Sequence, residues 1–172
     1  MDDKRMMLRH FLGAIAYRTQ KALKGAPPEF AGFRAATGVR TPHQIVYHMS
    51  SVLGYDRTFF VGGEFRPLIK DNFNSEIEEF HKILDSLKTH LEQGTPFQNT
   101  TPEKMLQGPF SDAMSHAGQL AMMRRLFGSP VPPENFIMAD IDGDNVGRDQ
   151  VEPVSPDREW LDAEGKRQKI IL

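Results

Sequence analysis

The stretch SDAMSHAGQLAMMRRLFG, residues 111–128, decides the fold of this chain. It predicts one helix, because side chains three or four positions apart share a helix face and here that face is mostly apolar. The face consists of Asp112, His116, Leu120, Met123 and Phe127. We expect it to point into a core, and it places two side chains that can bind a metal ion, Asp112 and His116, one helical turn apart.

Three further helices are expected upstream of this stretch, each with apolar side chains at helical spacing. They cover about residues 3–24, 41–60 and 71–93. The second of them has the clearest start, because Thr41 and Gln44 form the two ends of a capping box and Pro42 takes the first helical position.

A short helix is expected from Thr101 to about Gln107, with the dipeptide Gly108-Pro109 as a break before the main helix begins near Ser111. Asp112 would then lie in a first helical turn. An acid is favoured at that position by the helix dipole alone, so this is the simpler interpretation of Asp112.

Four helices with inward apolar stripes predict an all-α fold, a four-helix bundle over residues 1–128. At 172 residues the chain suits a single domain. Residues 129–172 are proline-rich and lack apolar periodicity, so they predict an irregular arm packed on the bundle, with room for a short strand or hairpin. Its expected anchors are Phe136, Ile137, Met138 and Trp160, and we expect the arm to narrow the open side of a metal pocket in the bundle.

Composition limits the partners and the compartment. The formal net charge is -2 at pH 7, which argues against a nucleic-acid partner. The chain has no cysteine, which excludes disulfides, thiolate catalysis and cysteine-ligated metals. We expect no signal peptide, and the sequence has no run of about 20 apolar residues. We therefore expect a cytoplasmic protein with no membrane partner.

A third metal-binding side chain, His48, lies on the inward face of the second expected helix. With Asp112 and His116 it makes two imidazoles and one carboxylate, a set that suits iron(II), zinc or nickel and leaves positions open for water or substrate. The alternative is that His48 is a core histidine with a satisfied hydrogen bond. Tyr47, Tyr55, Asp56 and Gln119 are candidate pocket or ligand-orienting residues.

Two stretches resemble the DinB family of bacterial four-helix bundles. They are TPHQIVYHMSSVLGYDRTFF, residues 41–60, and GPFSDAMSHAGQLAMMRRLFGSPVPPENF, residues 108–136. The sharpest element is His-x-Gly-Gln at His116, Gly118 and Gln119. The resemblance implies an up-down-down-up bundle, often a homodimer, with a divalent metal held by one histidine of the second helix and a His-x-x-x-His pair on the last.

Carried over to this chain, the family's first and last ligands match His48 and His116, while the middle position holds Asp112 in place of histidine. By resemblance, the chain is a divalent-metal-dependent enzyme acting on a small molecule, a thiol-dependent S-transferase or isomerase that uses a low-molecular-weight thiol. Hydroxide delivery at an open metal site would make it hydrolase-like instead. The alternatives are a non-catalytic metal- or ligand-binding stress-response module, and a plain helical dimer.

Overall fold

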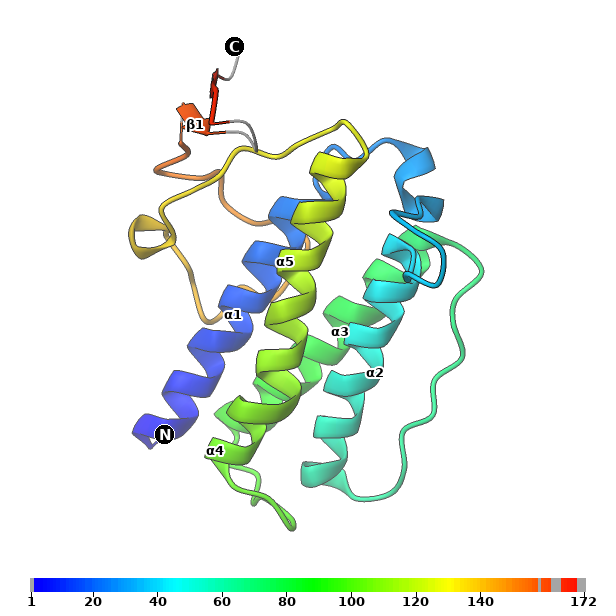
Figure 1. Cartoon of the computed structure of the whole chain (residues 1–172). Coiled ribbons are helices and arrows are strands. Elements are labelled where there is room, and N and C mark those ends of the chain that lie inside the picture. Colours follow the sequence, from blue (N-terminus) through cyan, green and yellow to red (C-terminus); the bar gives the residue numbers. More distant parts are fainter. Residues whose placement is uncertain (1, 158, 162–164, 170–172) are drawn as a thin grey trace.

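Four long helices dominate the computed structural model, which describes residues 2–157, 159–161 and 165–169 (Figure 1). They are α1 (Asp3–Leu23), α2 (Pro42–Val61), α3 (Phe73–Glu92) and α5 (Ser111–Leu126). The expected all-α bundle is therefore confirmed. Among the described residues, no helix is long and apolar enough to cross a bilayer.

The helices follow an up-down-down-up order. α1 and α2 run in opposite directions, and the connection 62–72 then returns along the outside of the bundle, so α3 starts at the same end as α2 (Figure 1). α5 runs back alongside α1 (Figure 1). This order places α5 between α1 and α2, so the side chains of α2 and α5 meet along one groove.

Side-chain caps set where three of these helices begin. Asp2, Thr41 and Asn72 each accept a hydrogen bond from a backbone N–H in the first turn, which satisfies a donor that the helix itself leaves unpaired. At Thr41 the expected capping box is present, with Gln44 as its second member. From these starts the apolar stripes converge on one core, which includes Leu12, Met49, Phe80, Leu84 and Leu120.

The segment before α5 has the expected break. α4 (Pro102–Met105) is followed by a π-helical turn, η2 (Leu106–Phe110), and the chain kinks there at Gly108 before α5 begins at Ser111. The wider turn accommodates Pro109, which has no backbone N–H, and Gly108 takes the non-helical angles φ -95° and ψ -105°. The hydroxyl of Ser111 donates to the carbonyl oxygen of Leu106 at 2.6 Å and helps close the turn.

Short elements complete the described chain. η1 (Pro28–Gly32) closes one end of the bundle, where Phe30 and Phe33 both pack edge-on against Phe127. Beyond α5 come η3 (Phe136–Met138) and an antiparallel hairpin of β1 (Glu159–Leu161) and β2 (Arg167–Lys169).

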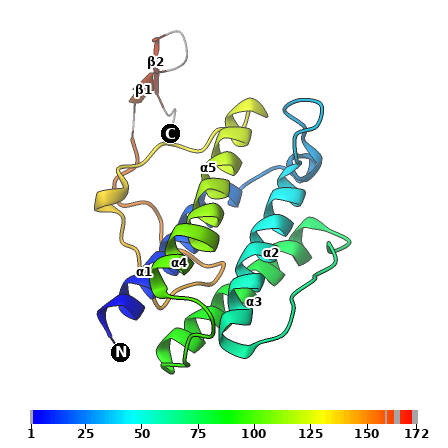
Figure 2. The ribbon, with the colours of Figure 1, turned by 60° about the horizontal axis from the view of Figure 1, so that its bottom comes forward.

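The arm after α5 lies along α1, on the side of the bundle away from α2, in both views (Figures 1 and 2). Glu134, whose side chain is 0% exposed, holds it there. Tyr17 donates its hydroxyl hydrogen to one carboxylate oxygen at 2.8 Å, and Lys21 binds the other at 2.9 Å. Burial together with the neighbouring Glu134 raises the pKa of Tyr17, so this phenol stays a donor.

The expected apolar anchors of the arm are only partly right. Phe136 packs edge-on against Tyr17, but Ile137 and Met138 are 88% and 61% exposed. The side chain of Trp160 lies outside the described part of the structure. Polar contacts replace the missing anchors, because His81 is buried and its Nδ1 lies 2.7 Å from the carbonyl oxygen of Val146.

Gly13 permits the closest approach of the arm to α1. A Cβ at this position would lie 2.5 Å from the carbonyl oxygen of Asp142, which is shorter than any real contact. We therefore expect Gly13→Ala to push residues 142–143 off α1 at a cost of about 1–3 kcal/mol, while the bundle still folds. Hydrogen exchange would show lost protection in the arm alone. The matched control is Gly118→Ala, because a Cβ at that position would meet open space. Unchanged exchange in the arm of Gly13→Ala would contradict this account.

Candidate metal centre

Three side chains from two helices converge where α2 meets α5. His48 comes from α2, and Asp112 and His116 come from α5. Each offers one donor atom, and these atoms all lie within 4.8 Å of one another. We call these residues the metal-binding cluster. The structure brings together the three residues that the sequence singled out.

The distances within the cluster fit a bound cation. His48 Nε2 lies 3.3 Å from Asp112 Oδ2, and His116 Nε2 lies 3.6 Å from Asp112 Oδ1. Two donors that are each about 2.0–2.1 Å from a tetrahedral ion lie about 3.3 Å apart. The two imidazole rings stand at 90° with centroids 4.7 Å apart, so neither ring covers the donor atom of the other. A divalent cation would replace weak histidine–carboxylate contacts with direct bonds.

A hydrogen bond orients His116 for this role. Its Nδ1 lies 2.8 Å from the side-chain oxygen of Gln119, one turn further along α5. Because that oxygen only accepts, Nδ1–H is the donor, and the lone pair is left on Nε2, the atom that faces Asp112. Ligating histidines in metal sites commonly have such a partner on the second ring nitrogen. Gln119 was among the candidate ligand-orienting residues, and it takes that position.

His48 is held in the neutral, ligand-competent form. Burial lowers its pKa below the ordinary 6.5, and the positive charge of Arg40 and the neighbouring His116 lower it further, against the opposing effect of Asp112. At pH 7 the ring is therefore mostly neutral, and one of its two nitrogens has a lone pair that can bind a metal. This argues against the interpretation of His48 as a core histidine, since its side chain is also 27% exposed.

The cluster lies at the solvent-facing edge of the bundle, not in the core as the sequence had suggested. The side chain of His116 is 8% exposed, whereas that of Asp112 is 45% exposed. The reason is that Ala113 takes the inward position in that turn of α5 and leaves Asp112 at the rim of the apolar stripe. Asp112 lies in the first turn of α5, directly after the kink at Gly108, so the helix dipole also favours an acid at this position.

Two hollows adjoin the cluster, one on each side. The Asp112 hollow, of about 490 Å³, has walls formed by Val52 and Tyr55 of α2 and by residues 107–115 around the π-helical turn. The His48 hollow, of about 550 Å³, is framed by residues 34–40, the first turns of α2 and residues 68–69. The cluster is therefore open to a small molecule from both sides.

The other candidate pocket residues have separate roles. Tyr55 is 54% exposed and lines the Asp112 hollow. Tyr47 lines the His48 hollow, but its hydroxyl donates to the carbonyl oxygen of Pro67 at 2.9 Å. Asp56 is completely buried, and neither of its oxygens has a hydrogen-bond partner among the described residues. That burial raises its pKa to about 8, far above the ordinary 3.8.

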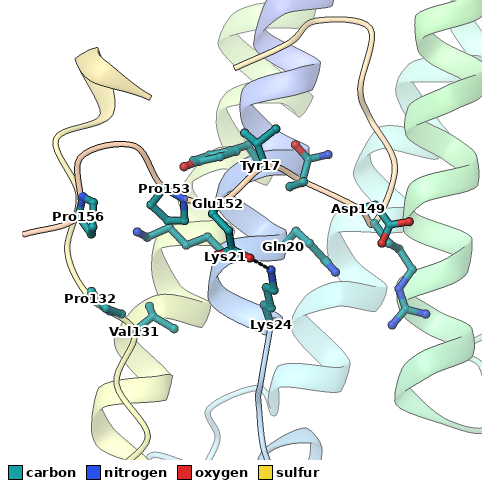
Figure 3. A pocket seen from close by; sticks show the side chains of 13 residues that line it. Tyr17, Gln20, Lys21, Lys24, Val131, Pro132, Asp149, Glu152, Pro153 and Pro156 are labelled. Atoms are coloured by element: carbon teal, nitrogen blue, oxygen red, sulfur yellow. Dashed lines mark hydrogen bonds and ion pairs between the residues drawn. The ribbon is translucent and has the colours of Figure 1, made fainter. Parts of the chain in front are cut away.

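A larger hollow, of about 860 Å³, lies elsewhere, between α1 and the arm (Figure 3). Its cations are already neutralised, because Lys21 binds Glu134 and Lys24 binds Glu152. The arm contributes no described residue to either hollow beside the metal-binding cluster. The expectation that the arm narrows the metal pocket is therefore wrong, because the arm is held on the α1 side of the bundle.

Gln119 offers a direct test of the geometry. We expect Gln119→Leu to lower metal affinity by about 10- to 100-fold, the usual effect of losing the partner that orients a ligating imidazole. Gln119→Glu keeps an acceptor oxygen and should retain the affinity. Gln119 is exposed, so we expect both variants to fold. Titration of the purified variants with Zn²⁺ by calorimetry measures the effect. Equal affinities for the Leu and Glu variants would show that Gln119 does not orient His116.

No protein-family model, no curated protein and no solved structure matches this chain.

Proposed function

We propose that this chain is a divalent-metal-dependent enzyme of the DinB-like type that acts on a small molecule with the help of a low-molecular-weight thiol. One observation carries the proposal: two histidines and one carboxylate from α2 and α5 place their donor atoms within 4.8 Å of one another between two open hollows. A structural metal site is closed, whereas a catalytic one keeps a position free.

Different residues of the chain would have different roles at the bound ion. His48 and His116 would each hold the ion through Nε2, and Asp112 would add a negative charge that retains it. Gln119 fixes the ring of His116, so the donor geometry exists before the ion arrives. A bound divalent ion would supply Lewis acidity and a coordination position for a thiolate or water. A set of two imidazoles and one carboxylate is typical of zinc, and it also suits nickel and iron(II).

The reaction class follows from the resemblance, namely S-transfer or isomerisation with a thiol cofactor, with hydrolysis as the other chemistry that an open metal site supports. Homodimer assembly and a cytoplasmic location stay predictions of the same kind. The second candidate function is a non-catalytic metal-binding stress-response module. Asp112 favours it, because a carboxylate stands where the resembling family has a histidine.

One experiment separates the two functions. The protein loaded with Zn²⁺ is incubated with glutathione or another small thiol and an electrophilic substrate, and loss of free thiol is followed with and without chelator. Metal-dependent consumption that disappears in His48→Ala supports the enzyme. No consumption with any of the three metals, while the metal still raises the melting temperature, supports the binding module.

A further inference from the structure

The His48 hollow carries an unusual concentration of positive charge. Two guanidinium groups, Arg34 and Arg40, line it, and no acidic side chain is among the described residues that line it. Arg34 donates one hydrogen bond, to the carbonyl oxygen of Val39 at 3.4 Å. Arg40 has no hydrogen-bond or ion-pair partner within the described part of the chain. Although the net charge of the protein is -2, the guanidinium groups of this hollow are available to an anion.

The position of Arg40 is fixed by the start of α2. It immediately precedes Thr41, whose capping box with Gln44 secures the backbone at that point. Its charge is close enough to His48 to help lower the pKa of that imidazole. Arg40 therefore lies beside one ligand of the metal-binding cluster while its own donors face the hollow without a partner.

One part of the wall of the hollow is apolar and is held in place. Leu68 and Ile69 line it and are 85% and 46% exposed, an unusual position for large aliphatic side chains in the connection 62–72. The hydroxyl of Tyr47 donates to the carbonyl oxygen of Pro67 at 2.9 Å and ties this wall to α2. The lining of the hollow thus combines two cations, two aliphatic side chains and one candidate metal ligand, His48.

We propose that Arg40, assisted by Arg34, is a specificity-determining residue that binds a carboxylate of the substrate, whose apolar body lies on Leu68 and Ile69 and whose far end reaches the metal-binding cluster. The guanidinium group pairs with carboxylates through a fork of parallel hydrogen bonds. The substrate class is therefore a small organic acid with a short apolar chain. The reach to the cluster rests on the proposed metal-dependent function, whereas the anion subsite does not.

The anion subsite is tested on metal-free protein. Butyrate and butan-1-ol have the same chain length and differ in charge, and each is titrated while the backbone amide signals of Tyr47 and His48 are followed by NMR. We expect butyrate to bind about tenfold more tightly than the alcohol, which corresponds to about 1.4 kcal/mol. Added salt should reduce the difference, since the hollow is open to solvent.

Two variants test whether Arg40 causes the preference for butyrate. Arg40→Gln should lose the preference for butyrate, while Arg66→Gln should keep it, because Arg66 lies outside the hollow with its side chain 84% exposed. Arg40 is exposed, so its replacement leaves the core intact. Equal binding of butyrate and butan-1-ol by the unaltered protein, or an unchanged preference in Arg40→Gln, would overturn the proposal.

A second experiment tests whether one molecule binds both the anion subsite and the metal-binding cluster. The protein is loaded with Co²⁺, and 3-mercaptopropionate and 3-mercaptopropan-1-ol are compared through the cobalt–thiolate absorption. Tighter binding of the acid, lost in Arg40→Gln, supports a ligand that spans the hollow. Equal binding of the two thiols overturns the spanning. Failure of Co²⁺ to bind at all overturns the metal-dependent function, while the butyrate result still decides the anion subsite.

Discussion

The His116→Ala variant is expected to lose metal binding almost entirely. His116 is the most buried of the three ligands and the one whose ring is oriented by a neighbour, so its loss removes both a donor atom and the order of the site. The fall in affinity should exceed the roughly 100-fold that loss of an orienting partner can cause. Zn²⁺ titration by calorimetry measures the affinity.

The matched control is His10→Ala, because His10 is an exposed histidine of α1 outside the cluster. It should bind Zn²⁺ as the unaltered protein does. Since His116→Ala also removes a mostly buried ring, its melting temperature without metal is measured alongside. A folded His116→Ala variant that binds Zn²⁺ normally would remove His116 from the ligand set.

The second large effect concerns Asp56 and pH. Its pKa is 3.8 in its ordinary state and about 8 in the folded protein because of burial. Between these values the folded state binds one more proton than the unfolded state, so the free energy of unfolding falls as pH rises, by about 1.4 kcal/mol per pH unit for this group. The contribution is fully present below the lower pKa and is lost as pH rises through the upper one.

Replacing Asp56 with Asn removes this titration. The difference in free energy of unfolding between Asp56→Asn and the unaltered protein should therefore grow in favour of the variant from about pH 4 to pH 8. Urea unfolding across that range measures it, with Asp85→Asn, an exposed acid of α3, as the control. Parallel pH profiles for Asp56→Asn and the unaltered protein would show that Asp56 titrates normally.

Periodicity predicted the bundle because the four long helices bury one stripe each and solvate the rest. The caps at Thr41 and the stops at Gly25 and Gly128 are local signals, so the boundaries of α1, α2 and α5 could be read closely. The proximity of His48, Asp112 and His116 could also be predicted, since they share the adjoining faces of two neighbouring helices.

The features that could not be predicted from the local sequence depend on tertiary packing. The dipeptide Gly108-Pro109 indicates the break, but it does not predict that the break is a kink at Gly108 within a π-helical turn. The exposure of Asp112 depends on which neighbour, here Ala113, points inward. The arm is held by buried polar side chains, Glu134 and His81, whose partners lie far away in the sequence.

The positive charge of the His48 hollow could not be predicted from the sequence for a similar reason. Arg34 and Arg40 stand in an irregular loop with no periodic signal, and only the fold brings them beside His48 and Ile69. Likewise, the buried carboxyl of Asp56 shares a helix face with His48, but the sequence does not reveal that no partner among the described residues reaches it.

The metal content of the tag-free protein tests the central claim most directly. The protein is stripped with chelator, exchanged into chelator-free buffer, offered Zn²⁺, Ni²⁺ and Fe²⁺ in turn, desalted and analysed for each element beside His48→Ala. The account predicts about one equivalent of metal per chain, with zinc retained best, and none in His48→Ala. No retained metal in the unaltered protein, or equal retention in His48→Ala, would contradict a metal centre at His48, Asp112 and His116.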